Sequence, residues 1–526
     1  MDFSSVAAIS TPYGRGAIAV IRISGENALE ILEKVFVPAS KKSVDSYRVG
    51  QLIRGDIVSS DGRMIDDGMA VFFKAPSSYT GENSAEIYCH GGILVSEEVL
   101  KAVFAAGALP AGPGEFTKRA FINGKLGLTE AEAVINTIDA QTKDKLDLAR
   151  SHRKGVLSAK IKEIYNALLT LVSSAYVFAD YPDEDLSDIS PEEMAQKLTD
   201  IHGKITNLAA TYKMGQAINE GIYTVLAGRP NTGKSSLLNL LLGSDRAIVS
   251  DTAGTTRDSI EESVSLGRIM LRLCDTAGIR EGKDEIEKLG IERSISALER
   301  AGLVIAVFDG SQEASDEDRK VCEIVSKLSC AKIALINKSD LENRLDLDTS
   351  AFDKTISMSA KYAENAEILT KEIESLFIEG EIDYDSDAIV SSARQRASLD
   401  RAAESVKNAL SALNAGYTPD VAGLDIEDAM SALGEIDGRT VSEDIVKDIK
   451  KYKVQELGKE TVAGKECTKY SVTLMMMGQP QKQTVWVYKG ITLKTTTNSD
   501  FGGNQTATKI QENVEIPASM FTVPEG

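Results

Sequence analysis

Residues 228–235 read Gly-Arg-Pro-Asn-Thr-Gly-Lys-Ser, which fits the phosphate-binding pattern G-x-x-x-x-G-K-[ST]. The segment follows an apolar run typical of a strand and precedes a leucine-rich stretch typical of a helix. In such a loop the backbone N–H groups point at phosphates, Lys234 neutralises the β and γ phosphates, and the Ser235 hydroxyl reaches Mg²⁺. A glycine turn without a ligand is the alternative for this loop taken alone. The predicted contacts are Asn231, Thr232, Gly233, Lys234, Ser235 and Ser236.

Two further motifs predict the base of the nucleotide. Asn337-Lys338-Ser339-Asp340 ends an apolar strand pattern, and the Asp340 carboxylate can accept the N1 and N2 hydrogens of guanine, which adenine does not offer. A third segment, Ser359-Ala360-Lys361, follows another short strand pattern and can support the guanine carbonyl. The nucleotide is therefore predicted to be GTP rather than ATP. Its base contacts are predicted to be Asn337, Lys338, Asp340, Ser359, Ala360 and Lys361.

The motif Asp275-Thr276-Ala277-Gly278 also follows an apolar run. At a strand end, Asp275 can reach Mg²⁺ through water and Gly278 can contact the γ-phosphate. The next residue is Ile279, where Ras-type GTPases keep a glutamine that orients the attacking water. Since an isoleucine cannot orient water, another acid or amide must do so. The acids available on the following stretch are Glu281, Asp284, Glu285 and Glu287.

Residues 250–258 form an oxygen-rich segment between the phosphate loop and Asp275. Its hydroxyls and carbonyls could hold Mg²⁺ at Thr256, or a monovalent cation that neutralises charge as an arginine finger would. A polar surface loop is the alternative. The predicted nucleotide contacts in this segment are Ser250, Asp251, Thr252, Ala253, Gly254, Thr255 and Thr256.

A chain of 526 residues is too long for a single hydrophobic core, so several domains are expected. The succession of strand-like and helix-like segments predicts a multidomain α/β protein. Apolar periodicity through Leu424 and Leu433 predicts a helix that packs with the earlier helical stretch around an inserted α/β unit. The predicted domains are an α+β N-terminal domain (1–122), a helical domain made of two separate segments (123–220 and 381–449), a P-loop G domain with a parallel sheet between them (221–380) and a β-rich tail (450–526).

Composition excludes several function classes. The 79 acidic against 59 basic residues give a formal charge of -20, which disfavours a stand-alone nucleic-acid binder, so action on RNA is expected to need a partner. Five scattered cysteines and three histidines predict neither a disulfide framework nor a zinc centre. No apolar run is long enough to span a bilayer and the start is unlike a secretory signal, so a cytoplasmic protein without membrane contact is expected.

Over about residues 3 to 447 the chain resembles the MnmE (TrmE) family of tRNA modification GTPases. The resemblance implies a GTPase that works with the FAD protein MnmG and adds an aminomethyl-type group to the wobble uridine of tRNA, taking carbon from a tetrahydrofolate derivative. It also implies a homodimer formed through the N-terminal domain. The segments that carry it are 11–16, 21–25, 79–82, 90–92, 112–116, 119–121 and 434–436.

The same resemblance assigns roles to single residues. It implies folate contacts at Arg22, Glu86 and Lys125, for which a surface ion pair is the alternative. It implies that Glu287 orients the water. The implied K⁺ ligands are Asn231, Ser250, Thr252 and Thr255; Ser250 and Thr252 stand where the family has a threonine and an aliphatic residue.

The end of the chain departs from the family pattern. Family members close with a C-x-G-K motif, and this chain has Val454 and Leu457 at the cysteine and lysine positions. Cys467 lies farther on, in strand-like sequence. The tail predicts an unrelated β-rich domain, and a natural fusion and an erroneous join of two reading frames both stay open. Two alternative functions follow: a GTPase without modification activity, and an Era-like switch in RNA assembly, which the acidic charge disfavours.

Overall fold

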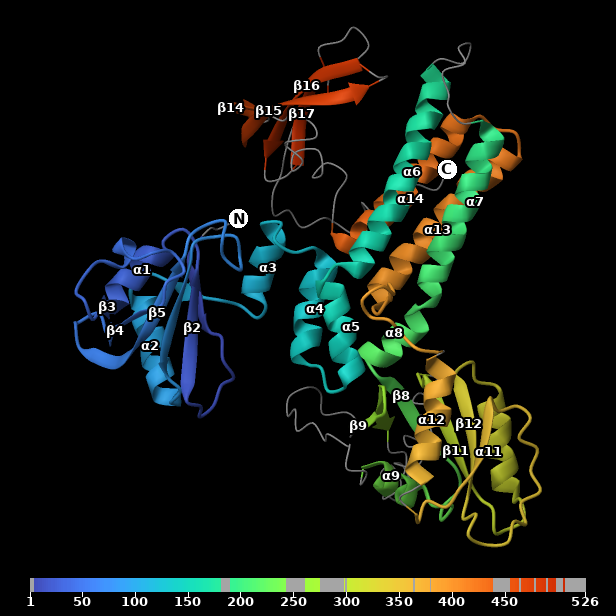
Figure 1. Cartoon of the computed structure of the whole chain (residues 1–526). Helices are drawn as coiled ribbons and strands as arrows, with labels where there is room; N and C mark the ends of the chain where they lie inside the picture. Colours follow the sequence, from blue (N-terminus) through green and yellow to red (C-terminus); the bar gives the residue numbers. More distant parts are fainter. Residues whose placement is uncertain are drawn as a thin grey trace, which may run out of the picture. The chain divides into compact units, whose positions relative to one another are not determined.

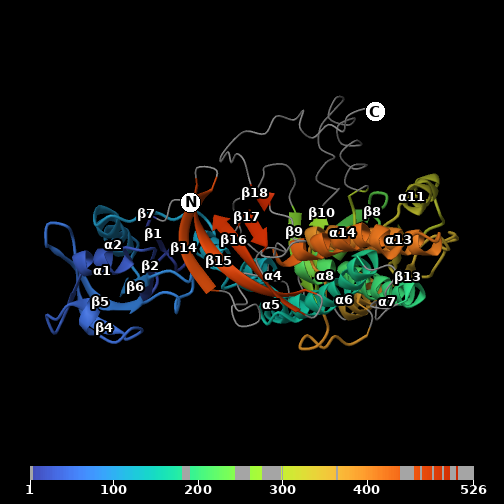
Figure 2. The ribbon, with the colours of Figure 1, turned by 90° about the horizontal axis from the view of Figure 1, so that it is seen from above.

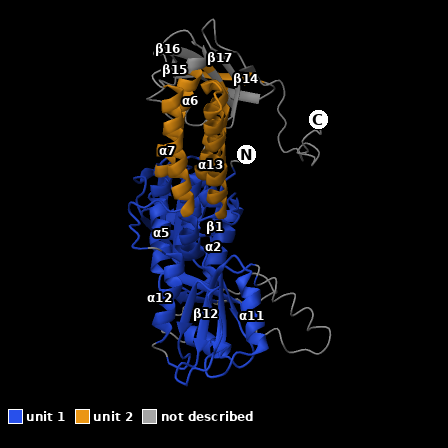
Figure 3. Cartoon of the chain, turned by 90° about the vertical axis from the view of Figure 1, so that its right-hand side faces the viewer, with its two compact units in different colours: residues 1–159, 211–392 blue, residues 160–210, 393–526 orange. Residues whose placement is uncertain are grey.

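The computed structural model describes the chain in two compact units, coloured separately in Figure 3. Unit 1 comprises residues 1–159 and 211–392, and unit 2 comprises residues 160–210 and 393–526. None of the helices within the described segments is long and apolar enough to cross a membrane. The described residues are 4–180, 190–242, 261–274, 298, 300–362, 365–378, 380–438, 455–462, 465–476, 479–488, 491–497 and 505–506.

A seven-stranded sheet forms the N-terminal portion of unit 1 (Figure 1), in the order β3-β4-β5-β6-β2-β1-β7. Neighbouring strands are antiparallel except β1 and β7. Helices α1 (Ala28–Val35) and α2 (Ile93–Ala105) bury their apolar sides in the same core as the sheet. The strands are β1 (Val6–Ile9), β2 (Ile18–Ser24), β3 (Phe36–Pro38), β4 (Ile53–Val58), β5 (Met64–Phe73), β6 (Ser84–His90) and β7 (Leu109–Pro110).

Strand alternation positions two polar residues on this sheet. Ile21 and Ile23 of β2 are buried in the core, while Arg22 between them is only partly buried. In β6 Glu86 is likewise partly buried between two buried residues, and the antiparallel register pairs it directly with Arg22. Since successive side chains of a strand point to opposite faces, both residues lie on the face away from the apolar core.

A six-stranded sheet in the order β13-β12-β11-β8-β10-β9 forms the G-domain portion of unit 1. All its neighbouring pairs are parallel except the β9–β10 hairpin at one edge, which the predicted parallel sheet did not include. Helices α9 (Lys234–Leu242) and α12 (Asn365–Phe377) share one core with the sheet, and α11 (Asp316–Ser326) shares a second. The strands are β8 (Ile222–Ala227), β9 (Glu261–Leu266), β10 (Ile269–Cys274), β11 (Leu303–Asp309), β12 (Ala331–Asn337) and β13 (Lys354–Ser357).

The remaining helices fall in both units. Those of unit 1 are α3 (Glu115–Ile122), α4 (Leu128–Ile138), α5 (Lys143–Arg153) and α8 (Tyr212–Asn219). Unit 2 holds α7 (Pro191–Ala210), α13 (Ala393–Asn414), α14 (Pro419–Asp437) and most of α6 (Val156–Asp180). Leu168, Val406 and Leu433 are buried there as helical periodicity predicts. Leu424 is 66% exposed, because the buried stripe of α14 runs through Ala422 and Ile426 instead.

The tail forms an antiparallel meander in the order β14-β15-β16-β17-β18 (Figure 2). This agrees with the β-rich tail predicted from the sequence and adds β14 and β18, which were not predicted. The strands are β14 (Gln455–Val462), β15 (Lys465–Met476), β16 (Gln479–Tyr488), β17 (Ile491–Thr497) and β18 (Gln505–Thr506).

Candidate functional site

The phosphate loop joins β8 to α9 with an unusual backbone. Gly228 and Gly233 have φ angles of 142° and 100°, and Asn231 has a φ of 64°. At Gly233 no side chain fits, because a β-carbon there would lie 2.0 Å from the Asn337 amide nitrogen. The Lys234 ammonium donates hydrogen bonds to the carbonyl oxygens of Gly228 (2.9 Å) and Arg229 (2.8 Å). The loop therefore curls around its own lysine at the start of α9, as a phosphate-binding loop requires.

A cavity of about 650 Å³ lies beside this loop. It brings together the phosphate loop, the end of β12 and the segment after β13, which are the segments that sequence analysis assigned to GTP. All the residues predicted to contact the base line it. Its walls are Gly233, Ser236, Asn239, Leu240, Asn337, Lys338, Asp340, Leu341, Ser359, Ala360 and Lys361.

Asn337 connects the three segments. Its side chain is 3% exposed, its amide nitrogen donates to the Thr232 carbonyl oxygen (2.8 Å), and its amide oxygen accepts from the Ala360 N–H (2.9 Å). Nearby Asp340 is exposed, and a hydrogen bond with Ser359 lowers the pKa of its carboxyl below the ordinary value. Asp340 is thus ionised at neutral pH and can accept two hydrogens from guanine.

Other predicted residues of the nucleotide site lie outside the described residues. These are the water-orienting acid, the second Mg²⁺ contact, the Asp-Thr-Ala-Gly motif and most of the K⁺ ligands. They are Ser250, Asp251, Thr252, Ala253, Gly254, Thr255, Thr256, Asp275, Thr276, Ala277, Gly278 and Glu287.

In the N-terminal domain the structure brings Arg22 and Glu86 together. The guanidinium forms an ion pair of 2.8 Å with the Glu86 carboxylate, whose second oxygen accepts from the Tyr88 hydroxyl at 2.6 Å. The guanidinium carbon lies 5.3 Å from the ring centre of Tyr79 and 5.5 Å from that of Phe116. Burial, followed by the hydrogen bond with Glu86, raises the pKa of Tyr88 to about 12, so its hydroxyl stays protonated and donates. The result is a charged pair bordered by aromatic rings.

Lys125, the third predicted folate contact, lies beside the loop that precedes β6. Its ammonium donates to the Pro76 carbonyl oxygen at 3.2 Å. Its aliphatic stem runs so close to Gly81 that a β-carbon there would lie 3.2 Å from it. Lys125 therefore contacts the same loop that carries Tyr79.

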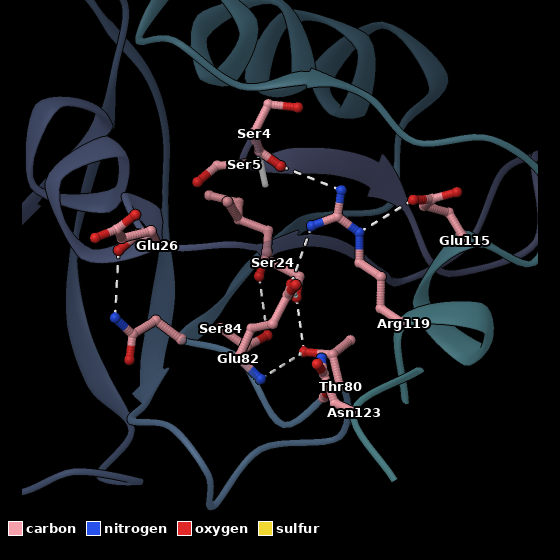
Figure 4. Close-up of polar contacts among 12 residues, drawn as sticks. Ser4, Ser5, Ser24, Glu26, Thr80, Glu82, Ser84, Glu115, Arg119 and Asn123 are labelled. Atoms are coloured by element: carbon pink, nitrogen blue, oxygen red, sulfur yellow. Dashed lines mark hydrogen bonds and ion pairs between the residues drawn. The ribbon is translucent and has the colours of Figure 1, made fainter. Parts of the chain in front are cut away.

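Sequence analysis gave no role to Arg119, which is the centre of a polar network in Figure 4. Its side chain is 9% exposed and pairs with Glu82 at 3.0 Å and Glu115 at 3.1 Å. Ser24 donates to the same Glu82 carboxylate oxygen at 2.8 Å and bonds Thr80 at 2.7 Å. The network fastens the loop before β6 and helix α3 to strand β2. In the sequence, Arg119 was visible only as part of the family-like segment 119–121, and nothing there indicated which acidic residues it would pair with.

Three family models match the chain. They are described as MnmE helical domain (residues 128–450), GTP-binding protein TrmE N-terminus (5–125) and a domain of unknown function (379–526). The chain is 38% identical over 453 residues to "tRNA modification GTPase MnmE" of Natranaerobius thermophilus, covering 85% of this chain and 98% of that protein. It is 42% identical over 450 residues to the protein of the same name from Syntrophus aciditrophicus, covering 84% and 97%.

Proposed function

The chain belongs to the MnmE family of tRNA modification GTPases, and on that premise we propose that it adds an aminomethyl-type group to the wobble uridine of tRNA. It is a GTP hydrolase with a role in tRNA modification, as its family is. The proposed partner is an MnmG-type flavoprotein that shares the reaction, and the proposed carbon source is a tetrahydrofolate derivative. We further propose that the protein acts as a homodimer.

The cavity beside the phosphate loop supports the nucleotide part of this proposal. Asn337 joins the phosphate loop to the segment at 359–361, and Asp340 stands at the cavity wall as an ionised acceptor. As part of the same proposal we assign Mg²⁺ to Ser235 and Thr256, and water orientation to Glu287. Bound Mg²⁺ would neutralise phosphate charge during transfer. The proposed K⁺ ligands are Asn231, Ser250, Thr252 and Thr255.

The polar pair on the N-terminal sheet supports the folate side. A pterin has an amide and an amino group along one edge, and both can donate hydrogen bonds to a carboxylate such as that of Glu86. Its flat rings can stack on the aromatic rings of Tyr79 and Phe116, which border the pair. The glutamyl tail of a folate is anionic, which suits Arg22 and Lys125. The donor set therefore fits a reduced folate, whose chemistry would be to supply a one-carbon unit.

Rates of GTP hydrolysis in KCl and NaCl at equal ionic strength test the nucleotide assignment. We expect hydrolysis to be at least about tenfold faster in KCl, because a single positioned group that stabilises transition-state charge typically contributes about 100- to 1000-fold. Equal rates would exclude the K⁺ assignment, and no hydrolysis in either salt would overturn the proposed function. Asn231→Ala should remove the difference between the two salts.

The alternative is a GTPase without modification activity. It is favoured by Leu457, which stands at the position of the family lysine and lies within strand β14. Mass spectrometry of tRNA nucleosides from a strain that relies on this chain decides between the two. The modified uridine should appear if the reaction is intact. If it appears only after the tail is replaced by a C-x-G-K ending following Ile449, the alternative holds.

A further inference from the structure

The connection between β11 and α11 touches the base-binding motif directly. Asp309 ends β11, stands in register with Asn337 of β12, and is 2% exposed. The next residue, Gly310, donates its N–H to the Asn337 carbonyl oxygen at 2.9 Å. A β-carbon at Gly310 would lie 3.0 Å from that same oxygen, so the backbone segments at Gly310 and Asn337 lie unusually close together. Asp309 is thus fixed beside the motif by backbone pairing.

Its carboxylate is fully engaged. One oxygen accepts from the Lys338 ammonium at 2.6 Å, and the other accepts from the N–H (3.0 Å) and hydroxyl (2.7 Å) of Ser311. Burial alone would raise the pKa of Asp309, but the hydrogen bonds from Lys338 and Ser311 outweigh it and lower the pKa below its ordinary value. Asp309 is therefore a buried anion whose main cationic partner is a wall residue of the cavity.

Lys338 combines a strained backbone with a side chain that is held by Asp309. Its φ of 65° lies in the left-handed region, which residues other than glycine adopt only when the surroundings hold them there. Its side chain lines the cavity between Asn337 and Asp340 and is about one-third exposed. Without an anchor, a lysine side chain in this position would sample many rotamers, and nucleotide binding would have to order it.

We propose that Asp309 is a positioning residue for nucleotide binding, which holds Lys338 along the cavity wall and thereby pre-forms the turn at 337–340. The inference rests on the assignment of this cavity to guanine. Asp309 itself lies behind Lys338 and acts through it. The motif alone does not reveal this role, since Asp309 precedes it by an entire helix and strand.

The test is the affinity of the full-length protein for GDP, measured by titration, with the dissociation rate of the nucleotide. Asp309→Asn keeps the size of the side chain and removes the charge that faces Lys338. We expect affinity to fall about tenfold and dissociation to accelerate, since a charge-assisted hydrogen bond is lost. The turnover rate at saturating GTP should stay unchanged. Affinities for GDP and IDP should fall equally, because a lysine cannot read the guanine 2-amino group.

The matched control is Glu372→Gln. It removes one negative charge from the Lys354–Glu372 ion pair, which joins β13 to α12 at 3.0 Å. This variant should bind GDP as the parent does. In a Lys338→Met background, Asp309→Asn should change affinity by less than about twofold, because the partner is already absent.

Three results would overturn the inference. The first is parental GDP affinity in Asp309→Asn, and the second is an undiminished effect of that change in the Lys338→Met background, which would indicate a purely structural role through Ser311. Should Asp309→Asn fail to fold, Ser311→Ala removes the hydroxyl that holds the carboxylate and should weaken GDP binding about twofold. The third overturning result is therefore an unchanged GDP affinity in Ser311→Ala. A parent that does not bind GDP would instead remove the guanine assignment itself.

Discussion

The nucleotide cavity and the N-terminal polar site use similar side chains but are assembled by different means. The cavity takes its walls from short continuous segments at strand ends, held by backbone conformations such as those of Gly233 and Lys338. The N-terminal site takes its partners from separate elements, where strand register sets Arg22 opposite Glu86. Loop geometry therefore positions the side chains in the first region, and cross-strand pairing positions them in the second. Substitutions in each region can therefore test whether loop conformation and strand register position the side chains separately.

The largest effect is expected at Asp340, which we assign to the guanine base. Asp340→Asn replaces an acceptor by a donor, so it should lower GTP affinity roughly 10,000-fold, at the lower end of the range by which a site built for one hydrogen-bond pattern rejects another. The same change should favour XTP, whose base offers an acceptor at the position of the 2-amino group. Competition between the two nucleotides in binding measurements shows this exchange.

Asp346→Asn provides the control for that change. Asp346 is exposed in the loop that follows, so losing its charge alters the local field without touching the cavity wall. It should leave the preference for GTP intact. A preference for GTP that persists in Asp340→Asn would remove Asp340 from base recognition.

The second effect concerns the stability of the N-terminal domain. Arg119→Met leaves Glu82 without its cation and leaves Glu115 with only the exposed Lys118, at 3.8 Å. Breaking a largely buried ion pair from one side costs about 3 kcal/mol. Hydrogen exchange of peptides from residues 5–125 should accelerate most in the loop before β6 and in α3. Arg54→Met is the matched control, because Arg54 is exposed and its ion pair with Asp67 is longer, at 3.7 Å. Equal protection in both variants would contradict the role of the network.

These cases show what the sequence could and could not predict. Most residues of the cavity wall could be named from the sequence, because each motif is continuous along the chain, as in Asn337 to Asp340. The wall residues Asn239, Leu240 and Leu341 were not named, because they belong to no motif. The parallel G-domain strands were predictable from apolar runs such as residues 303–308 of β11, which are buried throughout. The antiparallel edge strand β9 was not predicted. The pairing of Arg119 with Glu82 was not, because it depends on how a loop and a helix meet after folding. The exposure of Leu424 was missed because several helical phases fit one apolar pattern.

The third effect separates folate binding from folding. Arg22→Met removes a cation that is partly exposed and keeps a stem of similar length, so folding should be little affected. Calorimetric titration with 5-formyltetrahydrofolate should show affinity reduced about tenfold, as expected for one charge-assisted contact. GTP hydrolysis should be unchanged. If the parent itself gives no heat and no protection by the ligand, the N-terminal site has only a structural role.

The smallest effect is expected for a second pair that joins separate strands, His90 and Asp66. The His90 Nδ1 lies 2.8 Å from one Asp66 carboxylate oxygen, and the other oxygen accepts from the His90 backbone N–H at 2.8 Å. The hydrogen bond and charge of Asp66 raise the pKa of His90 above its ordinary value of 6.5, with a smaller contribution from Asp67. Because the pKa of His90 is higher in the folded than in the unfolded state, the pair stabilises the fold at pH values below the unfolded-state pKa. That stabilisation is lost as the pH rises through the folded-state pKa.

Titration of the His90 ring by NMR measures this pair directly. In the parent the midpoint should lie above 6.5, in Asp66→Asn it should return toward 6.5, and in Asp67→Asn it should move less. Because His90 is exposed, solvent screens the pair and the melting temperature should hardly change between the variants. A larger shift from Asp67→Asn than from Asp66→Asn would show that general charge, rather than the paired geometry of β5 and β6, sets the pKa. In that event strand register would not be what positions polar partners on this sheet.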